Sequence, residues 1–258
     1  MEGKSNKEKA REFWDDRAPL GQEAGTRDIV AKRLEIKAIL NYVRDGLTVL
    51  DVGCGNGITA IEIAKQYDID ITGFDFSEKM IEEARKLSKN EDLVGNVTFR
   101  QGDIQDFPAF SSSFDLILTE RALINLPDWP KQKKAIEDIV QLLSPNGRLL
   151  MCENSQDGLD AGNRLRKQVG LEEIEPPWHN RYFKDAELET LSLPDLELER
   201  IEYFTSTYYF LSRVVNAWLA SREGKSPEYD APVNKLALEL PVIGTLGQTR
   251  LWVWRKES

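Results

Sequence analysis

The chain has 258 residues, 41% of them hydrophobic, and a net charge of −10 at pH 7. This length and apolar content predict one α/β domain with an appended element and argue against a disordered chain. The negative charge argues against a general binder of nucleic acid backbones, so we expect no nucleic acid partner.

Residues 4–45 carry helical patterns of apolar residues, and the first nine residues lack the apolar core of a signal sequence. From residue 48 to 153 strands and helices alternate. The expected strands are 48–52, 70–74, 97–101, 114–119 and 147–153, and the expected helices are 57–67, 77–88 and 129–143. Such alternation predicts a parallel sheet that is covered by helices on both faces.

Beyond residue 155 the pattern is less regular. We expect helices at 157–166 and 185–191, a loop at 175–180, and strands at 196–205 and 248–255. The last two strands are separated by a long insertion, 206–247, whose composition is too apolar for disorder. No stretch is long enough for a membrane span. The two cysteines, Cys54 and Cys152, have no metal-site or disulfide spacing, which favours a reducing, cytoplasmic location.

The most informative segment is Val49–Gly57, with the sequence VLDVGCGNG. A buried strand followed by a glycine turn and a helix start is typical of a nucleotide site, because glycines let a ligand approach the main chain and the helix start offers free N–H groups. Ile58 stands where the dinucleotide fingerprint requires its third glycine, so the dehydrogenase pattern is broken.

Two acidic residues follow the next strands of the predicted sheet. Asp75 ends the strand 70–74, where a carboxylate can accept hydrogen bonds from both hydroxyls of a ribose. Asp103 follows the strand 97–101, although an aspartate after glycine is also ordinary turn chemistry. The pattern indicates a nucleoside without identifying it.

Together these segments resemble the class I S-adenosylmethionine-dependent methyltransferases, whose motifs occur in order as VLDVGCGNG, ITGFDFS, FRQGDI, FDLILTERALINLP and LLSPNGRLLM. The resemblance covers about residues 45–155. It implies a Rossmann-like α/β fold, with a doubly wound, mainly parallel seven-stranded sheet, N-terminal helices and a helical insertion between the last two strands. We expect a helical cap at 1–45, a cofactor-binding core at 46–155, and at 156–258 the rest of the core with a substrate-covering insertion near 206–247.

The resemblance also implies a role for each matching position, with S-adenosylmethionine as cofactor and S-adenosylhomocysteine as product. Asp51 would orient the glycine loop, Asp75 would hold the ribose, and Asp103 would accept from the adenine amino group. Thr119 and Glu120 would lie near the sulfonium. The expected cofactor-binding set is completed by Gly53, Cys54, Gly55, Gly57, Phe76, Met80, Gly102 and Ile104.

Methyl transfer needs a base when the accepting atom is a weakly acidic hydroxyl. His179 is the only histidine and its unperturbed pKa is close to neutral, so it is one candidate base, although a loop histidine that merely lies beside a tryptophan is the favoured alternative. Glu120 is the other candidate. Many relatives carry histidines at the end of the fourth motif, where this chain has Glu120 and Arg121. These two side chains either bind a polar substrate or form an ion pair with each other.

Aromatic residues outside the core motifs are candidate walls of a substrate pocket. The expected substrate-binding residues are Trp14, Arg121, Trp178, Tyr208 and Tyr209, and the alternative for each aromatic ring is simple packing on the sheet. We expect a methyltransferase acting on oxygen or nitrogen of a small polar metabolite such as a sugar. A non-catalytic S-adenosylmethionine-binding protein and, third, a nicotinamide oxidoreductase are the alternatives. No metal is predicted, and the sequence does not indicate an oligomeric state.

Overall fold

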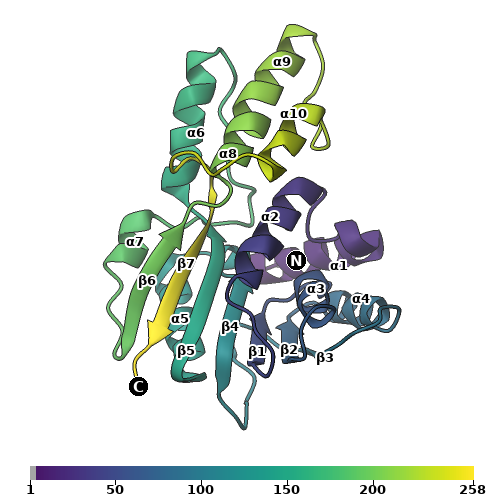
Figure 1. Cartoon of the computed structure of the whole chain (residues 1–258), viewed down its shortest axis with the longest axis vertical. Helices are drawn as coiled ribbons and strands as arrows, with labels where there is room; N and C mark the ends of the chain where they lie inside the picture. The colour runs from purple at the N-terminus through teal and green to yellow at the C-terminus, as the bar shows by residue number, and fades with distance from the viewer. Residues whose placement is uncertain (1–3) are drawn as a thin grey trace.

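A seven-stranded sheet with the order β3-β2-β1-β4-β5-β7-β6 forms the centre of the computed structural model, which describes residues 4–258 (Figure 1). Only β7 runs antiparallel to its neighbours, β5 and β6. The strands are β1 Thr48–Val52, β2 Asp70–Asp75, β3 Asn96–Gln101, β4 Phe114–Glu120, β5 Leu143–Asn154, β6 Leu196–Glu202 and β7 Thr249–Lys256. The predicted mainly parallel seven-stranded sheet is therefore confirmed.

Helices cover both faces of this sheet, as the alternation predicts. Successive strand residues point to opposite faces, so Val49 joins one apolar cluster and Leu50 the other. The helices α2 Ile29–Leu40, α3 Ile58–Ala64 and α4 Glu78–Ser88 pack on the first face, and α5 Trp129–Gln141 and α7 Asp185–Glu189 pack on the second. Two separate buried layers thus hold the sheet in place.

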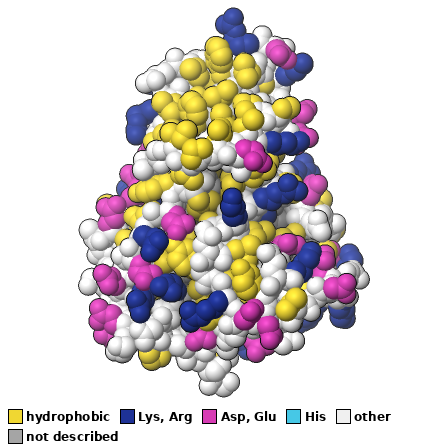
Figure 2. All heavy atoms as spheres, in the orientation of Figure 1, with side chains coloured by type: hydrophobic (Ala, Val, Ile, Leu, Met, Phe, Trp, Pro, Cys, Tyr) yellow, Lys and Arg dark blue, Asp and Glu magenta, His cyan; other side chains and the backbone are white. Residues whose placement is uncertain are grey.

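The insertion between β6 and β7 is helical, as predicted. It contains α8 Ser206–Tyr209, a π-helical stretch Phe210–Asn216, α9 Ala217–Arg222 and α10 Pro232–Lys235. With α6 Gln156–Gln168 it rises above the carboxyl ends of the parallel strands (Figure 1). Figure 2 shows apolar side chains gathered over this upper part of the molecule.

The chain before β1 forms α1 Asn6–Arg17, a 3-10 helix Ala18–Glu23 and α2. Ser5 caps α1 through its hydroxyl, which accepts from the Glu8 N–H, and Glu8 completes the capping box. No residue of α1 is buried. This helix is therefore held by contacts at its surface rather than by a core of its own.

Several element ends differ from the prediction. The helix expected to reach residue 67 ends at Ala64, and the strand expected to reach residue 205 ends at Glu202. Strand β5 begins at Leu143 instead of the expected residue 147, and a register shift between Phe114 and Leu116 accommodates this early start. Within residues 4–258 none of the helices has the length and apolar character needed to cross a bilayer.

Candidate active site

The turn after β1 opens onto a cavity. Gly53 and Gly55 line it, with φ angles of 72° and 53°. A side chain at Gly55 would meet no atom within 4 Å, so its backbone is open to a ligand. Gly57 does not line the cavity, because its Cα faces the ring of Phe99, 2.6 Å from where a Cβ would lie. The expectation that Gly57 contacts a ligand is corrected: it is glycine because of its φ of 75° and this close packing.

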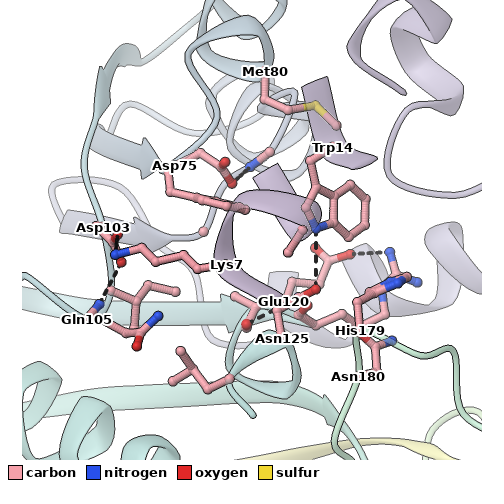
Figure 3. A pocket seen from close by; sticks show the side chains of 18 of the residues that line it. Lys7, Trp14, Asp75, Met80, Asp103, Gln105, Glu120, Asn125, His179 and Asn180 are labelled. Atoms are coloured by element: carbon pink, nitrogen blue, oxygen red, sulfur yellow. Dashed lines mark hydrogen bonds and ion pairs between the residues drawn. The ribbon is translucent and has the colours of Figure 1, made fainter. Parts of the chain in front are cut away.

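The cavity measures about 760 Å³ and lies at the carboxyl ends of β1, β2 and β4, beside α1. Figure 3 shows Asp75 and Asp103 toward one end of it, and Asn125, His179 and Asn180 toward the other. Ten of the thirteen expected cofactor residues line it, namely Asp51, Gly53, Cys54, Gly55, Asp75, Phe76, Met80, Asp103, Ile104 and Glu120. Thr119 and Gly102 do not; Thr119 is fully buried in β4, and Gly102 packs against Pro108 and Phe74.

Asp75 stands at the end of β2 with its carboxylate in the cavity wall. One oxygen accepts from the Gly55 N–H at 3.0 Å and the other from the Ser77 N–H at 2.9 Å. Burial raises the pKa of Asp75 to about 6, against the lowering effect of these two bonds. Asp51, lower in the cavity, is buried too, and burial raises its pKa to about 8.

Asp103 carries contacts of a different kind. One oxygen accepts from the Gln105 N–H at 2.8 Å, and the other lies 2.6 Å from the ammonium of Lys7. Lys7 comes from α1, so the N-terminal helix reaches across this end of the cavity (Figure 3). The loop after β3 and the first turn of α1 thereby form a joint wall.

Four charged side chains meet where β4 ends. Glu120 forms ion pairs with Lys32 and with Arg121, whose Nη2 is 3.4 Å away, and it accepts from the Thr59 hydroxyl. Arg121 also donates to the fully buried Glu35 at 2.9 Å. Burial alone would raise the pKa of Glu120, but the two cations lower it well below its ordinary value. The lowered pKa makes Glu120 a weak proton acceptor, which argues against it as the base.

His179 lies at the other end among aromatic rings. Its imidazole centre is 4.4 Å from the ring of Phe13, 5.2 Å from Trp178 and 5.7 Å from Trp14. Burial, and after it the charge of Arg17, lower the pKa of His179 below its ordinary 6.5. The imidazole is therefore neutral at pH 7.

The insertion does not contribute to the cavity wall. Tyr208 and Tyr209 are buried in a cluster with Val30, Ala31 and Ala237, away from the lining, so the expectation that they bind substrate is corrected. The Tyr208 hydroxyl donates to Asp28, and the Tyr209 hydroxyl lies 3.0 Å from that of Thr249. Their rings anchor the insertion on α2. Trp14, Arg121 and Trp178 do line the cavity.

Residues 43–175 match the family model described as "Methyltransferase domain", which is half of the chain. The chain is 30% identical over 194 residues to the 27-O-demethylrifamycin SV methyltransferase of Amycolatopsis mediterranei, covering 71% of this chain and 67% of that protein. The chain belongs to the S-adenosylmethionine-dependent methyltransferases.

A second methyltransferase relative is the O-methyltransferase rstn1 of Aspergillus nomiae, 33% identical over 152 residues, with 58% of this chain and 63% of that protein covered. The chain thus spans about two thirds of these relatives' own length. Among solved structures, a chain of the complex between the Haloferax volcanii Trm112 methyltransferase activator and a methyltransferase has a TM-score of 0.63 and 19% identity, covering 95% of this chain and 98% of that one. That likeness shows the methyltransferase fold.

The cavity lining also includes polar residues of this methyltransferase that were not predicted, among them Lys7, Lys32, Asn125 and Asn180. Lys7 and Lys32 lie on helices with many other charges, and no local pattern marks them. Asn125 belongs to the fourth motif and Asn180 follows His179, so proximity to motif residues was the available signal. The Asn125 side chain accepts from the Trp14 indole at 3.3 Å and donates to the Arg121 carbonyl at 2.7 Å.

Proposed function

We propose that this methyltransferase transfers the methyl group of S-adenosylmethionine to a hydroxyl oxygen of a small molecule, with His179 as the base. The observation that carries the proposal is the neutral imidazole of His179 at the end of the cavity opposite Asp75 and Asp103. A neutral imidazole is able to take a proton at pH 7. The names of both relatives, which place the methyl group on oxygen, support this choice over nitrogen.

The cavity residues fit the cofactor. Asp75 offers a carboxylate for the two ribose hydroxyls, and Asp103 offers one for the adenine amino group, with Phe76 and Met80 as apolar neighbours. The open backbone at Gly55 leaves room for the methionine part, whose charged ends would meet the cluster of Lys32 and Glu120. S-adenosylmethionine supplies the methyl group on a sulfonium, which is a good leaving group.

The chain's own part in the reaction is alignment and proton removal. The acceptor hydroxyl would give its proton to His179 while its oxygen forms a bond to the methyl carbon. The electron pair of the broken carbon–sulfur bond stays on sulfur, and S-adenosylhomocysteine results. The imidazolium then releases its proton to water, so that protons and charge balance.

The absence of the insertion from the lining supports an enzyme over the non-catalytic binding protein. No residue of 206–247 enters the cavity, so the insertion does not block it. The free cysteines Cys54 and Cys152 support a reducing compartment such as the cytosol.

Two measurements test the proposal. Calorimetry should show binding of S-adenosylhomocysteine and none of NAD; the reverse result would contradict the cofactor assignment. With an accepted hydroxyl substrate, His179→Gln should lower kcat at least tenfold and change the affinity for S-adenosylhomocysteine little. In the wild-type enzyme kcat should fall at a lower pH than it would with an unperturbed imidazole, because burial lowers the pKa of His179.

A further inference from the structure

Two polar atoms at the acceptor end of the cavity are buried and have no hydrogen-bond partner. They are Nδ1 of His179 and Oδ1 of Asn180, on neighbouring residues that both line the cavity (Figure 3). A buried acceptor without a donor costs about 1 to 3 kcal/mol, so such pairs call for an explanation. A ligand that donates to both atoms would remove this cost.

The loop that carries these atoms is held in a fixed position. The Asn180 N–H donates to the Pro177 carbonyl at 2.9 Å, and the Arg181 N–H donates to the Ile124 carbonyl at 2.7 Å. Gln132 donates to the Arg181 carbonyl at 2.9 Å, and it accepts from the Arg181 guanidinium at 2.6 Å. The backbone of this loop is therefore fixed, whereas the two covered acceptor atoms become accessible to a ligand when their side chains rotate.

The surroundings of the two acceptors are flat and apolar. Trp178 and Trp14 stand edge-on to the His179 ring, at 81° and 78°, and Phe13 lies on the far side at 4.4 Å. Leu126 and Pro127 add apolar surface to the same lining. An aromatic ring gains from such edge-to-face contacts, by about 0.5 to 1.5 kcal/mol per pair.

The charges at this end are already paired. The Arg181 guanidinium binds Glu187, with Nη1 at 2.8 Å, and Lys131 lies 3.9 Å from Asp128 at the rim. An anionic ligand would thus meet no free cation among these residues. A sugar would bring several hydroxyls, which is more than the two unpartnered acceptor atoms require.

We infer that the acceptor subsite takes a neutral, planar aromatic molecule with at least two hydroxyl groups, one donating to His179 Nδ1 and one to Asn180 Oδ1. This inference rests on the proposed function and names its substrate class. It assigns Asn180 as a positioning residue that orients the ring, while the hydroxyl on His179 is the one that is methylated. A phenolic hydroxyl has a pKa of about 10, whereas an aliphatic hydroxyl resembles water at about 16, so a phenol is the easier acid for an imidazole.

Binding of simple probes tests the inference without turnover. The enzyme saturated with S-adenosylhomocysteine is titrated with 2,3- and 2,7-dihydroxynaphthalene, with the dimethyl ether of each, and with methyl β-glucoside. We expect at least one diol to bind about tenfold or more tightly than its diether, which cannot donate. Because His179 is the only histidine, its single imidazole NMR signal reports the contact directly, and it should move with the diol and not with the diether.

Asn180→Ala should weaken binding of the diol about three- to tenfold, through loss of one hydrogen bond, with S-adenosylhomocysteine affinity unchanged. Asn90→Ala, at an exposed asparagine after α4, is the matched control and should leave both affinities unchanged. Equal binding of diol and diether, preference for the glucoside, or no binding of any probe by the saturated enzyme would each overturn the inference. Failure of S-adenosylhomocysteine itself to bind would instead overturn the proposed function.

Discussion

The carboxylate of Asp75 holds the glycine turn, and its protonation should make cofactor affinity depend on pH. Its two oxygens fix the Gly55 and Ser77 N–H groups, yet burial raises its pKa to about 6. Below that pH the group is protonated and loses part of its capacity to accept from a ribose. The affinity for S-adenosylhomocysteine should therefore be constant above pH 7 and fall by up to about tenfold per pH unit below 6. Calorimetry between pH 8 and 5 measures this.

The control for Asp75 is Asp75→Asn, which carries no titratable group. It should bind S-adenosylhomocysteine about tenfold or more weakly at pH 8, since charge-assisted hydrogen bonds are worth about 1.5 to 3 kcal/mol. Its affinity should also vary less between pH 7 and 5 than that of the wild type. If the wild-type affinity for S-adenosylhomocysteine does not change down to pH 5, Asp75 does not bind the ribose.

At the scale of elements, α1 is held over the cavity by polar contacts and by packing of Phe13 and Trp14. Besides Lys7 with Asp103, the Ser77 hydroxyl donates to Asp15 and the Trp14 indole donates to Asn125. Lys7 occupies the carboxylate that we assign to adenine, so the helix and the cofactor compete for Asp103. Lys7→Ala should raise the affinity for S-adenosylhomocysteine, by no more than about fivefold because exposed ion pairs are worth about 1 kcal/mol or less.

Lys4→Ala is the matched control for Lys7, because Lys4 pairs with Glu12 within the same region of the chain and does not line the cavity. It should leave the affinity unchanged when both variants are measured by calorimetry at one salt concentration. A lower affinity in Lys7→Ala would mean that Lys7 contacts the cofactor instead of competing with it.

The junction of α2, α3 and β4 depends on the buried charges around Glu120. Glu120→Gln keeps the size of the side chain but leaves Lys32 without its anion and Arg121 with Glu35 alone. Breaking a buried pair in this way costs about 3 to 5 kcal/mol. Urea unfolding should show this loss at pH 7, whereas Glu62→Gln, which breaks a surface pair with Lys65, should cost less than about 1 kcal/mol. Equal losses in the two variants would show that the cluster does not stabilise the junction.

The elements also show what a sequence alone is able to predict. The strands alternate with helices, and parallel order brings their carboxyl ends together, so Asp75 at the end of β2 and Asp103 after β3 were placed at one edge without coordinates. The positions of Tyr208 and Tyr209 were not predicted correctly. An aromatic run indicates burial but does not identify the partner, and Tyr208 contacts Asp28, 180 residues earlier in the chain. The pairing of Lys7 with Asp103 also joins residues far apart in sequence, and either residue alone is ordinary.

For the whole molecule, cofactor binding and folding are linked, because the cavity draws residues from α1, the β1 turn, the loops after β2, β3 and β4, and the loop that carries His179. A ligand of such a site binds the folded chain and not the unfolded one. At a concentration of 100 times its Kd, S-adenosylhomocysteine should add about 2.7 kcal/mol to the free energy of unfolding. For a chain of this size that raises Tm by about 5 to 10 °C.

A thermal unfolding scan with S-adenosylhomocysteine, and one with the same concentration of NAD, measures this linkage. NAD should give no shift, because Ile58 stands where the dinucleotide turn requires its third glycine. Asp75→Asn should shift less than the wild type at one fixed ligand concentration, since its fractional saturation is lower. A Tm shift of equal size with NAD would show that the glycine turn does not select S-adenosylhomocysteine over other nucleotides. A smaller Tm shift in Asp75→Asn would show that the stabilisation comes from binding in the cavity and not from binding elsewhere.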